Sequence, residues 1–257
     1  MKLCVVGAGG RMGQYVLELA GAAPDIDIVA AVDHPESPLV GTQVAAGVTV
    51  DSDVEAAVAA ADVYVDFSVP AATAAAAHAG AKHKVAGVVG TTGLDAPAES
   101  ALAELARHAP MLLAANFSLG VNLLMVLAEK AAAALPGYDL EVVELHHNKK
   151  RDAPSGTAIA LAKALAAGRG LDYDHARRYS REGNVGERPA DEIGVVAVRG
   201  GDVIGEHTAY LVGGTERIEL SHRAANRSLF ADGALRAARW LHDKQPGRYT
   251  MRDVLGL

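Results

Sequence analysis

The sequence has one cysteine, no long apolar run and no excess of positive charge, and each absence argues against a class of protein. Cys4 alone cannot form an intrachain disulfide or a cysteine-rich zinc cluster, which favours a reducing compartment and no metal site. The net charge of −7, with both signs mixed along the chain, disfavours nucleic acid as a partner. The first apolar run, Leu3 to Val6, is too short for a signal peptide or a membrane span. We therefore expect a cytoplasmic protein that binds neither nucleic acid nor membrane.

Apolar residues, in contrast, are plentiful. They make up 50% of the 257 residues, so the chain can bury the core of one large domain or of two modest ones. The alanine-rich stretches at 56–61, 71–77 and 131–134 favour helices, because alanine is the strongest helix former. No internal repeat is present.

The N-terminal segment has the layout of a dinucleotide-binding βαβ unit. A short apolar run is followed by a glycine-rich turn, a helix-like stretch, and a second apolar run that ends in Asp33. Glycines allow the backbone to approach a pyrophosphate, the helix N-terminus attracts its charge, and the acid accepts hydrogen bonds from the adenine ribose. The cofactor contacts predicted here are Gly7, Ala8, Gly9, Gly10, Arg11, Met12, Asp33 and His34. The spacing of Gly7, Gly10 and Gly13 is wider than in the usual motif, so a simple turn is the alternative interpretation.

The residue after the acid bears on which nicotinamide cofactor is preferred. An arginine there could hold a 2′-phosphate, which Asp33 alone would repel, but this chain has His34. A neutral imidazole is a weak phosphate ligand, which favours NADH, while Arg11 could compensate. The preference between NADH and NADPH stays open.

The alternation of strands and helices continues to about residue 117. Helices are predicted at 54–61, 70–81 and 97–107, and strands at 63–68, 85–89 and 111–115. In an open parallel sheet, the loops that leave the carboxyl ends of the strands line the ligand crevice. Further cofactor contacts are therefore expected at Gly90, Thr91, Thr92, Ala114, Ala115, Asn116 and Phe117. Each of these loops could instead be a plain turn or a helix cap.

The second half has a different pattern. Helices are predicted at 121–135 and 155–167, and strands at 140–145, 193–199, 203–210 and 216–222. Glycine-rich turns join the last three strands, which predicts an antiparallel meander, and the connection 168–188 is too polar for the core. The fold class is thus α/β: a Rossmann-type, mostly parallel domain at 1–117, and a smaller α+β domain with an antiparallel or mixed sheet at 118–228. The C-terminal segment 229–257 contains an amphipathic helix that is expected to pack back on the first domain.

The segment from Glu144 to Thr157 concentrates polar chemistry at a predicted strand end. It places His146, His147, Lys149, Lys150 and Arg151 in six positions and then opens a helix with Ser155, Gly156 and Thr157. Histidines and lysines are candidate general acids, and free amides at a helix N-terminus favour a carboxylate or a phosphate. The segment therefore predicts an anion site with proton donors beside it. The alternative is a solvated basic loop.

These segments resemble the 4-hydroxy-tetrahydrodipicolinate reductase (dihydrodipicolinate reductase) family of lysine and diaminopimelate biosynthesis over nearly the whole chain. The most specific pattern is the histidine pair followed by Lys-x-Asp-Ala-Pro-Ser-Gly-Thr, which here ends at Thr157. Further matching segments are 7–13, 90–93, 115–122, 199–207 and 221–223.

The resemblance implies NAD(P)H-dependent reduction of 4-hydroxy-2,3,4,5-tetrahydrodipicolinate to 2,3,4,5-tetrahydrodipicolinate, with loss of water. It implies that His146 is a proton donor or acceptor and Lys150 a proton donor, without deciding which of the two protonates the product. It also implies that His147, Gly156 and Thr157 bind the small dicarboxylate substrate, and that the cofactor contacts are those named above. The family is cytoplasmic, is usually tetrameric through its antiparallel sheet, and uses NADH or NADPH, so a homotetramer is expected.

Two rival functions share the dinucleotide motif. A different dehydrogenase on the same cofactor domain, or a non-catalytic nucleotide sensor, would need the first half of the chain alone. Neither requires the segment from His146 to Thr157, which therefore discriminates against both.

Overall fold

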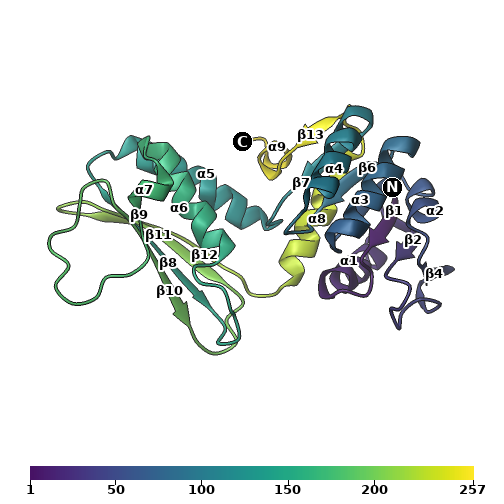
Figure 1. The fold of residues 1–257 in the computed structure, drawn as a ribbon, viewed down its shortest axis with the longest axis horizontal. Helices are drawn as coiled ribbons and strands as arrows, with labels where there is room; N and C mark the ends of the chain where they lie inside the picture. Colours follow the sequence, from purple (N-terminus) through teal and green to yellow (C-terminus); the bar gives the residue numbers. More distant parts are fainter. The chain divides into compact units, whose positions relative to one another are not determined.

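The computed structural model describes residues 1–257, and the chain separates into two compact units (Figure 1). Unit 1 comprises residues 1–119 and 228–257, and unit 2 comprises residues 120–227. None of the helices combines the length and the apolar character that crossing a bilayer requires.

Unit 1 is built on an eight-stranded sheet of order β13-β7-β6-β5-β1-β2-β4-β3. The strands are β1 (Lys2–Val6), β2 (Asp27–Val32), β3 (Gln43–Ala45), β4 (Val48–Asp51), β5 (Val63–Asp66), β6 (Ala86–Val89), β7 (Pro110–Leu113) and β13 (Gly247–Tyr249). All neighbouring strands are parallel except the β3–β4 hairpin. The strand order reverses at β1, which places the ligand crevice of such a fold at the carboxyl ends of β1 and its neighbours. The predicted Rossmann-type sheet is confirmed.

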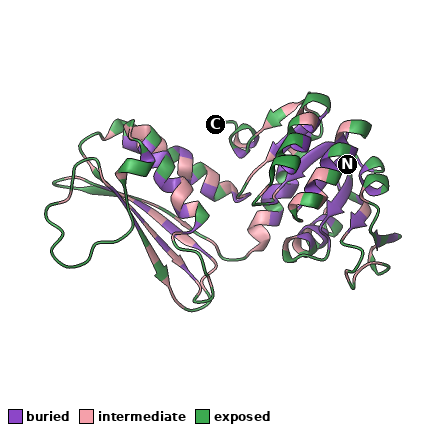
Figure 2. Ribbon diagram, in the orientation of Figure 1, coloured by how far each residue is buried: buried purple, intermediate pink, exposed green.

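Helices cover both faces of this sheet and form a core on each face. The strands between the two cores are therefore buried (Figure 2). They are α1 (Arg11–Gly21), α2 (Val54–Ala59), α3 (Pro70–His83), α4 (Ala96–His108), α8 (Ser228–Leu241) and α9 (Met251–Leu255). Along β1, Leu3 and Val5 pack in one core with α1 and α8, while Cys4 and Val6 pack in the other. A strand that is buried on both faces reads as a continuous apolar run, which is why the sequence lacks alternation there. Burial raises the pKa of the Cys4 thiol to about 12, so this cysteine is an inert core residue.

Local sequence signals fix the helix ends. Asp53 and Asp95 cap α2 and α4 by accepting backbone N–H groups, each at 3.0 Å. Pro70 opens α3, where its missing N–H costs nothing. These signals are readable from the sequence, and the predicted helices of unit 1 agree with the observed ones to within two residues at nearly every end.

Unit 2 carries a five-stranded mixed sheet of order β12-β11-β8-β10-β9. The strands are β8 (Asp139–His146), β9 (Arg177–Arg178), β10 (Ile193–Arg199), β11 (Glu206–Val212) and β12 (Arg217–Arg223). The predicted antiparallel pairing of β11 with β12 is confirmed, but the three-stranded meander is wrong, because β8 lies between β10 and β11, parallel to β10 and antiparallel to β11. The helix between β8 and β10 makes this pair a parallel crossover, a pairing that turn signals alone cannot indicate.

Three helices belong to unit 2: α5 (Leu119–Ala134), α6 (Gly156–Arg169) and α7 (Tyr173–Ala176). Strand β8 alternates buried and partly exposed residues along its length, as expected for a sheet with one covered face. Its inward residues pack with residues of α5 and α6 in a single core. On the sheet, Val196, Val198 and Ile218 are exposed.

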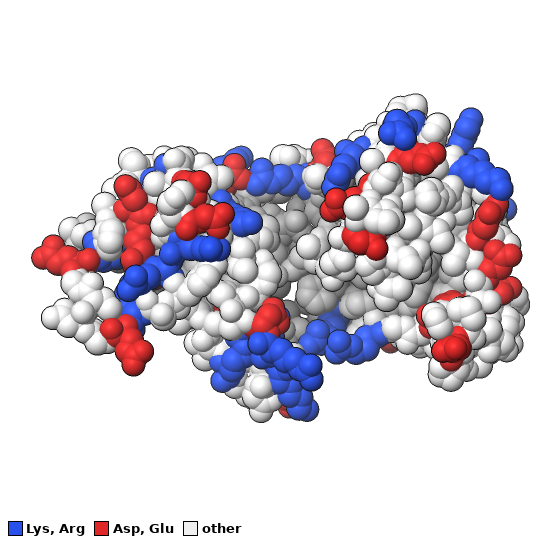
Figure 3. Space-filling view, in the orientation of Figure 1, with Lys and Arg blue, Asp and Glu red and all other residues white.

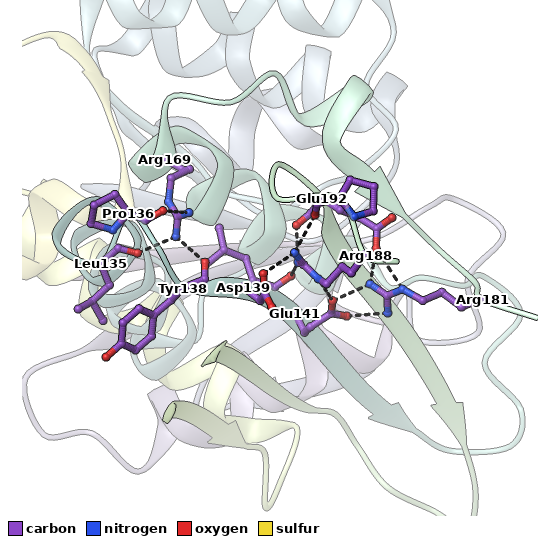
Figure 4. Close-up of polar contacts among 11 residues, drawn as sticks. Leu135, Pro136, Tyr138, Asp139, Glu141, Arg169, Arg181, Arg188 and Glu192 are labelled. Atoms are coloured by element: carbon purple, nitrogen blue, oxygen red, sulfur yellow. Dashed lines mark hydrogen bonds and ion pairs between the residues drawn. The ribbon is translucent and has the colours of Figure 1, made fainter. Parts of the chain in front are cut away.

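The polar connection after α6 is better anchored than the sequence indicates. Tyr173 is buried in the core of unit 2, contrary to the expectation that the segment 168–188 lies outside it. Arg181 and Arg188 both bind the carboxylate of Glu141 on β8 (Figure 4). Arg169 donates to four backbone carbonyls at the end of α5 and beyond it, which satisfies acceptors that a helix end leaves free. Long-range arginine contacts thus hold a segment whose composition resembles a loop.

Candidate functional site

The glycine-rich turn of unit 1 lies between β1 and α1, and neither Gly7 in the turn nor Gly13 in α1 has room for a side chain. Gly7 has φ +79°, and a Cβ on it would lie 2.7 Å from the Phe67 carbonyl oxygen. A Cβ on Gly13 would lie 2.2 Å from the Gly7 carbonyl oxygen. Both positions therefore require glycine, and the N-terminus of α1 is packed directly against the end of β1.

Asp33 lies beside this turn, at the end of β2. A Cβ on Gly9 would lie 1.9 Å from Asp33 Oδ2. The carboxylate accepts the His34 amide at 2.8 Å and the Ser37 hydroxyl at 2.9 Å. Helix α1 begins after Gly10, which has no side chain to cap it, and its first turn holds no acidic residue. A bare glycine cradle, a helix N-terminus and an acid together fit the pyrophosphate and ribose of a dinucleotide.

The loops after β6 and β7 meet the same region of unit 1 through Phe67, which follows β5. A Cβ on Gly90 would lie 2.1 Å from the Phe67 ring, and the rings of Phe67 and Phe117 are edge to face at 5.5 Å. A Cβ on Gly7 would likewise meet the Phe67 backbone. The structure thus brings together the three loops that the sequence predicts as cofactor contacts. Of these residues, Arg11, His34, Thr92 and Ala115 are exposed, Ala114 and Asn116 are partly exposed, and Thr91 and Phe117 are buried.

Asp66, the last residue of β5, accepts hydrogen bonds from the residues that follow this strand. Its buried carboxylate accepts the Ser68 hydroxyl at 2.5 Å, the Ser68 amide at 2.9 Å and the Thr73 hydroxyl at 2.6 Å. The Ser68 amide also lies 3.1 Å from the Thr91 hydroxyl. Burial raises the pKa of Asp66, although these hydrogen bonds oppose the shift. No sequence motif marks Asp66 or Phe67 for a role.

In unit 2, the predicted polar segment begins where β8 ends. His146 is the last residue of β8 and is buried, while His147 and Lys150 are partly exposed. Lys150 Nζ lies 2.9 Å from Asp152 Oδ1. Lys149 and Arg151 are exposed. Figure 3 shows Lys and Arg side chains gathered at the end of unit 2 where the loops that follow β8 and β10 lie.

The N-terminus of α6 stands beside this segment. Ser155 caps the helix by accepting the Ala158 amide at 3.2 Å, as its sequence position predicts. The first turn of α6 has no acidic residue, and Gly156 and Thr157 are its first two residues. Their amide groups, with the positive end of the helix dipole, are suited to a carboxylate.

Glu144 and His207 contact the His146 ring, and Arg199 in turn binds Glu144. Glu144 binds His146 Nδ1, and Arg199 binds Glu144 with Nη1–Oε2 and Nη2–Oε1 distances of 2.8 and 2.9 Å. The His207 ring lies edge-on to the His146 ring at 5.1 Å, with its Nε2 3.0 Å from the Ser155 hydroxyl. Burial, followed by the charge of His146, lowers the pKa of His207 to about 4, so His207 is neutral at neutral pH. Burial also lowers the pKa of His146, against the opposing effect of Glu144.

The contact of His147 with Arg227 indicates which ring nitrogen carries the proton. Its Nε2 lies 3.3 Å from an Arg227 guanidinium nitrogen. A guanidinium only donates, so Nε2 accepts and, in the neutral ring, Nδ1 carries the proton. That Nδ1 is buried and has no hydrogen-bond partner within the protein.

The sequence predicts the site residues of the segment from His146 to Thr157, but not the residues that bind them. Glu144, Arg199, His207 and Arg227 received no role. Glu144 lies in the segment 144–157, and Arg199 and His207 lie in the segment 199–207. Both segments resemble the family, which was the one signal for these residues in the sequence.

Comparisons with known proteins agree with this geometry. The family described as "Dihydrodipicolinate reductase, N-terminus" matches residues 1–117, and "Dihydrodipicolinate reductase, C-terminus" matches residues 120–255. The 4-hydroxy-tetrahydrodipicolinate reductase of Thiobacillus denitrificans is 46% identical, with 100% of this chain and 99% of that protein covered. The same enzyme of Alkalilimnicola ehrlichii is 47% identical at the same coverage.

Among solved structures, the fold is similar to a dipicolinate-bound dihydrodipicolinate reductase from Paenisporosarcina sp. TG-14. The two share 24% identity and a TM-score of 0.80, with 97% of each chain covered. GenD2 from gentamicin A biosynthesis, solved in complex with NAD, has a similar fold at a TM-score of 0.61 and 18% identity, covering 99% of this chain and 90% of that one. With both family regions matched and relatives nearly half identical over their full length, the chain belongs to the dihydrodipicolinate reductase family.

Proposed function

We propose that this chain catalyses the NAD(P)H-dependent reduction of 4-hydroxy-2,3,4,5-tetrahydrodipicolinate to 2,3,4,5-tetrahydrodipicolinate, with loss of water, in lysine and diaminopimelate biosynthesis. The observation that carries this proposal is the loop after β8. His146 and Lys150, the proton donors of this proposal, lie there beside the N-terminus of α6, whose first turn has no acidic residue. Proton donors next to a carboxylate site suit reduction of a small dicarboxylate.

Unit 1 is the cofactor domain of this proposal. The glycine turn and the first turn of α1 hold the pyrophosphate, Asp33 binds the adenine ribose, and the loops after β6 and β7 border the rest of the cofactor. When bound, the reduced nicotinamide supplies the hydride. The proposed contacts are Gly7, Ala8, Gly9, Gly10, Arg11, Met12, Asp33, His34, Gly90, Thr91, Thr92, Ala114, Ala115, Asn116 and Phe117. The exposed imidazole of His34 provides no fixed charge for a 2′-phosphate, so NADH serves at least as well as NADPH.

Unit 2 is the substrate domain. The amides of Gly156 and Thr157 bind one substrate carboxylate, and the unpartnered Nδ1–H of His147 adds a donor. Reduction of a conjugated imine leaves electron density that a nearby acid must protonate, and His146 and Lys150 are the groups placed to do so. His207 stays neutral at neutral pH, so it adds no further positive charge beside His146.

We further propose a division into domains, an assembly and a location for this chain. The cofactor domain comprises residues 1–117 with the C-terminal segment 229–257, and the substrate domain comprises 118–228. The exposed aliphatic residues Val196, Val198 and Ile218 on the sheet of unit 2 support a homotetramer formed through this sheet. A single, buried, free cysteine is consistent with work in the cytoplasm.

A direct assay tests the function. Fresh condensation product of pyruvate and aspartate semialdehyde is mixed with the enzyme and NADH, or separately NADPH, and absorbance of the reduced cofactor is followed. We expect rapid oxidation that requires the condensation product and is competitively inhibited by pyridine-2,6-dicarboxylate. Binding of both cofactors without any oxidation would contradict the proposal and favour a different substrate or a sensor.

A further inference from the structure

Glu144 is a buried carboxylate to which the proposed chemistry gives no part. It lies on β8 two residues before His146, and its side chain is fully buried. It binds the His146 ring, and Arg199 binds both of its oxygens. Its Oε1 also accepts the Ser155 amide at 2.9 Å. Two of its three partners therefore belong to the candidate site or cap its helix.

The charge state of Glu144 determines the proton position on His146. Burial raises the pKa of Glu144, but hydrogen bonds from Arg199, His146 and the Ser155 amide outweigh burial and keep the pKa below its ordinary value. The carboxylate is therefore ionised at neutral pH and can only accept hydrogen bonds. His146 Nδ1 must carry a proton, so Nε2 is the nitrogen that gains and loses one.

The surroundings of the His146 ring keep Nε2 open and make Glu144 its stabilising charge. A Cβ on Gly205 would lie 2.9 Å from Nε2, so glycine leaves this nitrogen uncovered. Burial lowers the pKa of His146; Glu144 opposes that effect, while Lys150 and Arg199 add to it. The neighbouring His207 is uncharged at neutral pH. Among these neighbours, Glu144 alone favours the protonated ring.

We propose that Glu144 is a positioning residue of the reductase, acting through His146 and through the N-terminus of α6. The inference rests on the function proposed above. The carboxylate holds His146 with Nδ1 protonated and Nε2 free to exchange the catalytic proton, as an orienting carboxylate does for other catalytic histidines. By accepting the Ser155 amide, the same carboxylate fixes the helix end that binds the substrate.

Glu141 is a matched control on the same strand. Its carboxylate also binds arginines, Arg181 and Arg188, but those contacts hold the connection before β10 and involve no histidine (Figure 4). Glu141→Gln therefore removes a charge from the same strand and an arginine-bound carboxylate, without touching the site.

Steady-state kinetics make the first test. Glu144→Gln keeps the shape of the side chain, removes its charge, and offers an N–H to Nδ1, which would move the ring proton to Nε2. We expect turnover to fall about 100-fold, the scale of a general acid–base group. The KM for substrate should rise, the His146 limb of the pH profile should move to lower pH, and NADH affinity should be unchanged. Glu141→Gln should stay within about twofold of wild-type turnover.

Nuclear magnetic resonance of ¹⁵N-histidine-labelled full-length enzyme makes the second test and needs no turnover. The His146 signals are assigned by their loss in His146→Gln. We expect the neutral wild-type ring to carry its proton on Nδ1, and the Glu144→Gln ring to carry it on Nε2. If Glu144→Gln does not fold, the position of the His146 ring proton in the wild-type spectrum tests the inference by itself. A wild-type Nε2–H ring, or folded Glu144→Gln with turnover within about threefold of wild type, would overturn the inference. A wild-type enzyme without turnover would instead refute the proposed reductase function, and the spectrum would still report the role of Glu144.

Discussion

The molecule has two helix N-termini suited to anions, and they are built in opposite ways. Helix α1 of unit 1 begins after Gly10, without a side-chain cap, and packs so closely on β1 that Gly7 and Gly13 have no room for a side chain. Helix α6 of unit 2 begins after the capping hydroxyl of Ser155 and is surrounded by ionisable side chains. The first arrangement suits a cofactor that brings its own reactive group and needs only close backbone approach. The second suits a substrate that must also exchange protons.

Filling the turn at α1 should have the largest effect. Gly13→Ala places a methyl group 2.2 Å from the Gly7 carbonyl oxygen, and backbone on both sides cannot yield. We expect a loss of about 3 kcal/mol in the free energy of unfolding and a drop in NADH affinity of at least about 100-fold. Thermal unfolding and a fluorescence titration with NADH measure the two effects.

Gly21→Ala is the control in the same helix, because the nearest atom to its Cβ is 4.0 Å away. This variant should keep both stability and affinity. Equal losses in the two variants would show that the α1 turn does not depend on close packing.

Acid should weaken unit 2 through its buried histidine. The pKa of His207 is lowered to about 4 in the folded protein, from an ordinary value of 6.5, so the unfolded chain binds more protons between these values. The contribution of neutral His207 to the free energy of unfolding is complete above about pH 6.5. It is lost as the pH falls towards 4, by about 3 kcal/mol in total. Urea unfolding at several pH values in this window measures the slope.

The variant His207→Gln distinguishes the effect of His207 on the pH dependence of stability from the effects of other acid-sensitive groups. His207→Gln should have a shallower pH slope than wild type, whereas the control His175→Gln, at an exposed position, should not. Identical slopes for wild type and His207→Gln would contradict the burial account.

A methyl group beside His146 should lower turnover without changing the affinity for the cofactor. In Gly205→Ala the new Cβ lies 2.9 Å from Nε2 of a ring that Glu144 holds in place. We expect turnover to fall roughly 10-fold with NADH affinity unchanged. Gly214→Ala is the control, because nothing lies within 4 Å of its Cβ. Unchanged turnover in Gly205→Ala would mean that Nε2 is not the working nitrogen.

The smallest expected effect concerns cofactor choice in unit 1. His34→Arg adds a fixed cation next to Asp33, where a 2′-phosphate would lie in a dinucleotide site. We expect NADPH affinity to rise about fivefold, the scale of one exposed charge-assisted hydrogen bond, with NADH affinity unchanged. Equal changes for both cofactors, or none, would show that residue 34 does not face the 2′ position.

The two regions also differ in how far sequence predicts them. The unit 1 turn follows from a contiguous pattern, since glycines, an apolar run and an acid 20 residues on specify their own geometry. The helices there were predictable because caps and proline starts are local signals. What local pattern could not supply was Phe67, whose ring joins two loops that are distant in sequence.

Unit 2 was harder because its contacts are long-range. The three-stranded meander was wrong because β8 lies between β10 and β11. Turn residues do not specify which strands of a sheet are neighbours. Arg199 binds Glu144 across 55 residues, and His207 meets Ser155 across 52. The sequence located the histidines, the lysine and the helix start, but the partners that fix their protonation became visible only in the fold.

The most direct test of the division of labour between the units uses Lys150→Ala. NADH affinity by titration and turnover by cofactor absorbance are measured on the same preparation. If unit 2 supplies proton donation and unit 1 holds the cofactor, turnover falls about 100-fold while NADH affinity stays within about twofold of wild type. Near-native turnover with weakened NADH binding would contradict the account.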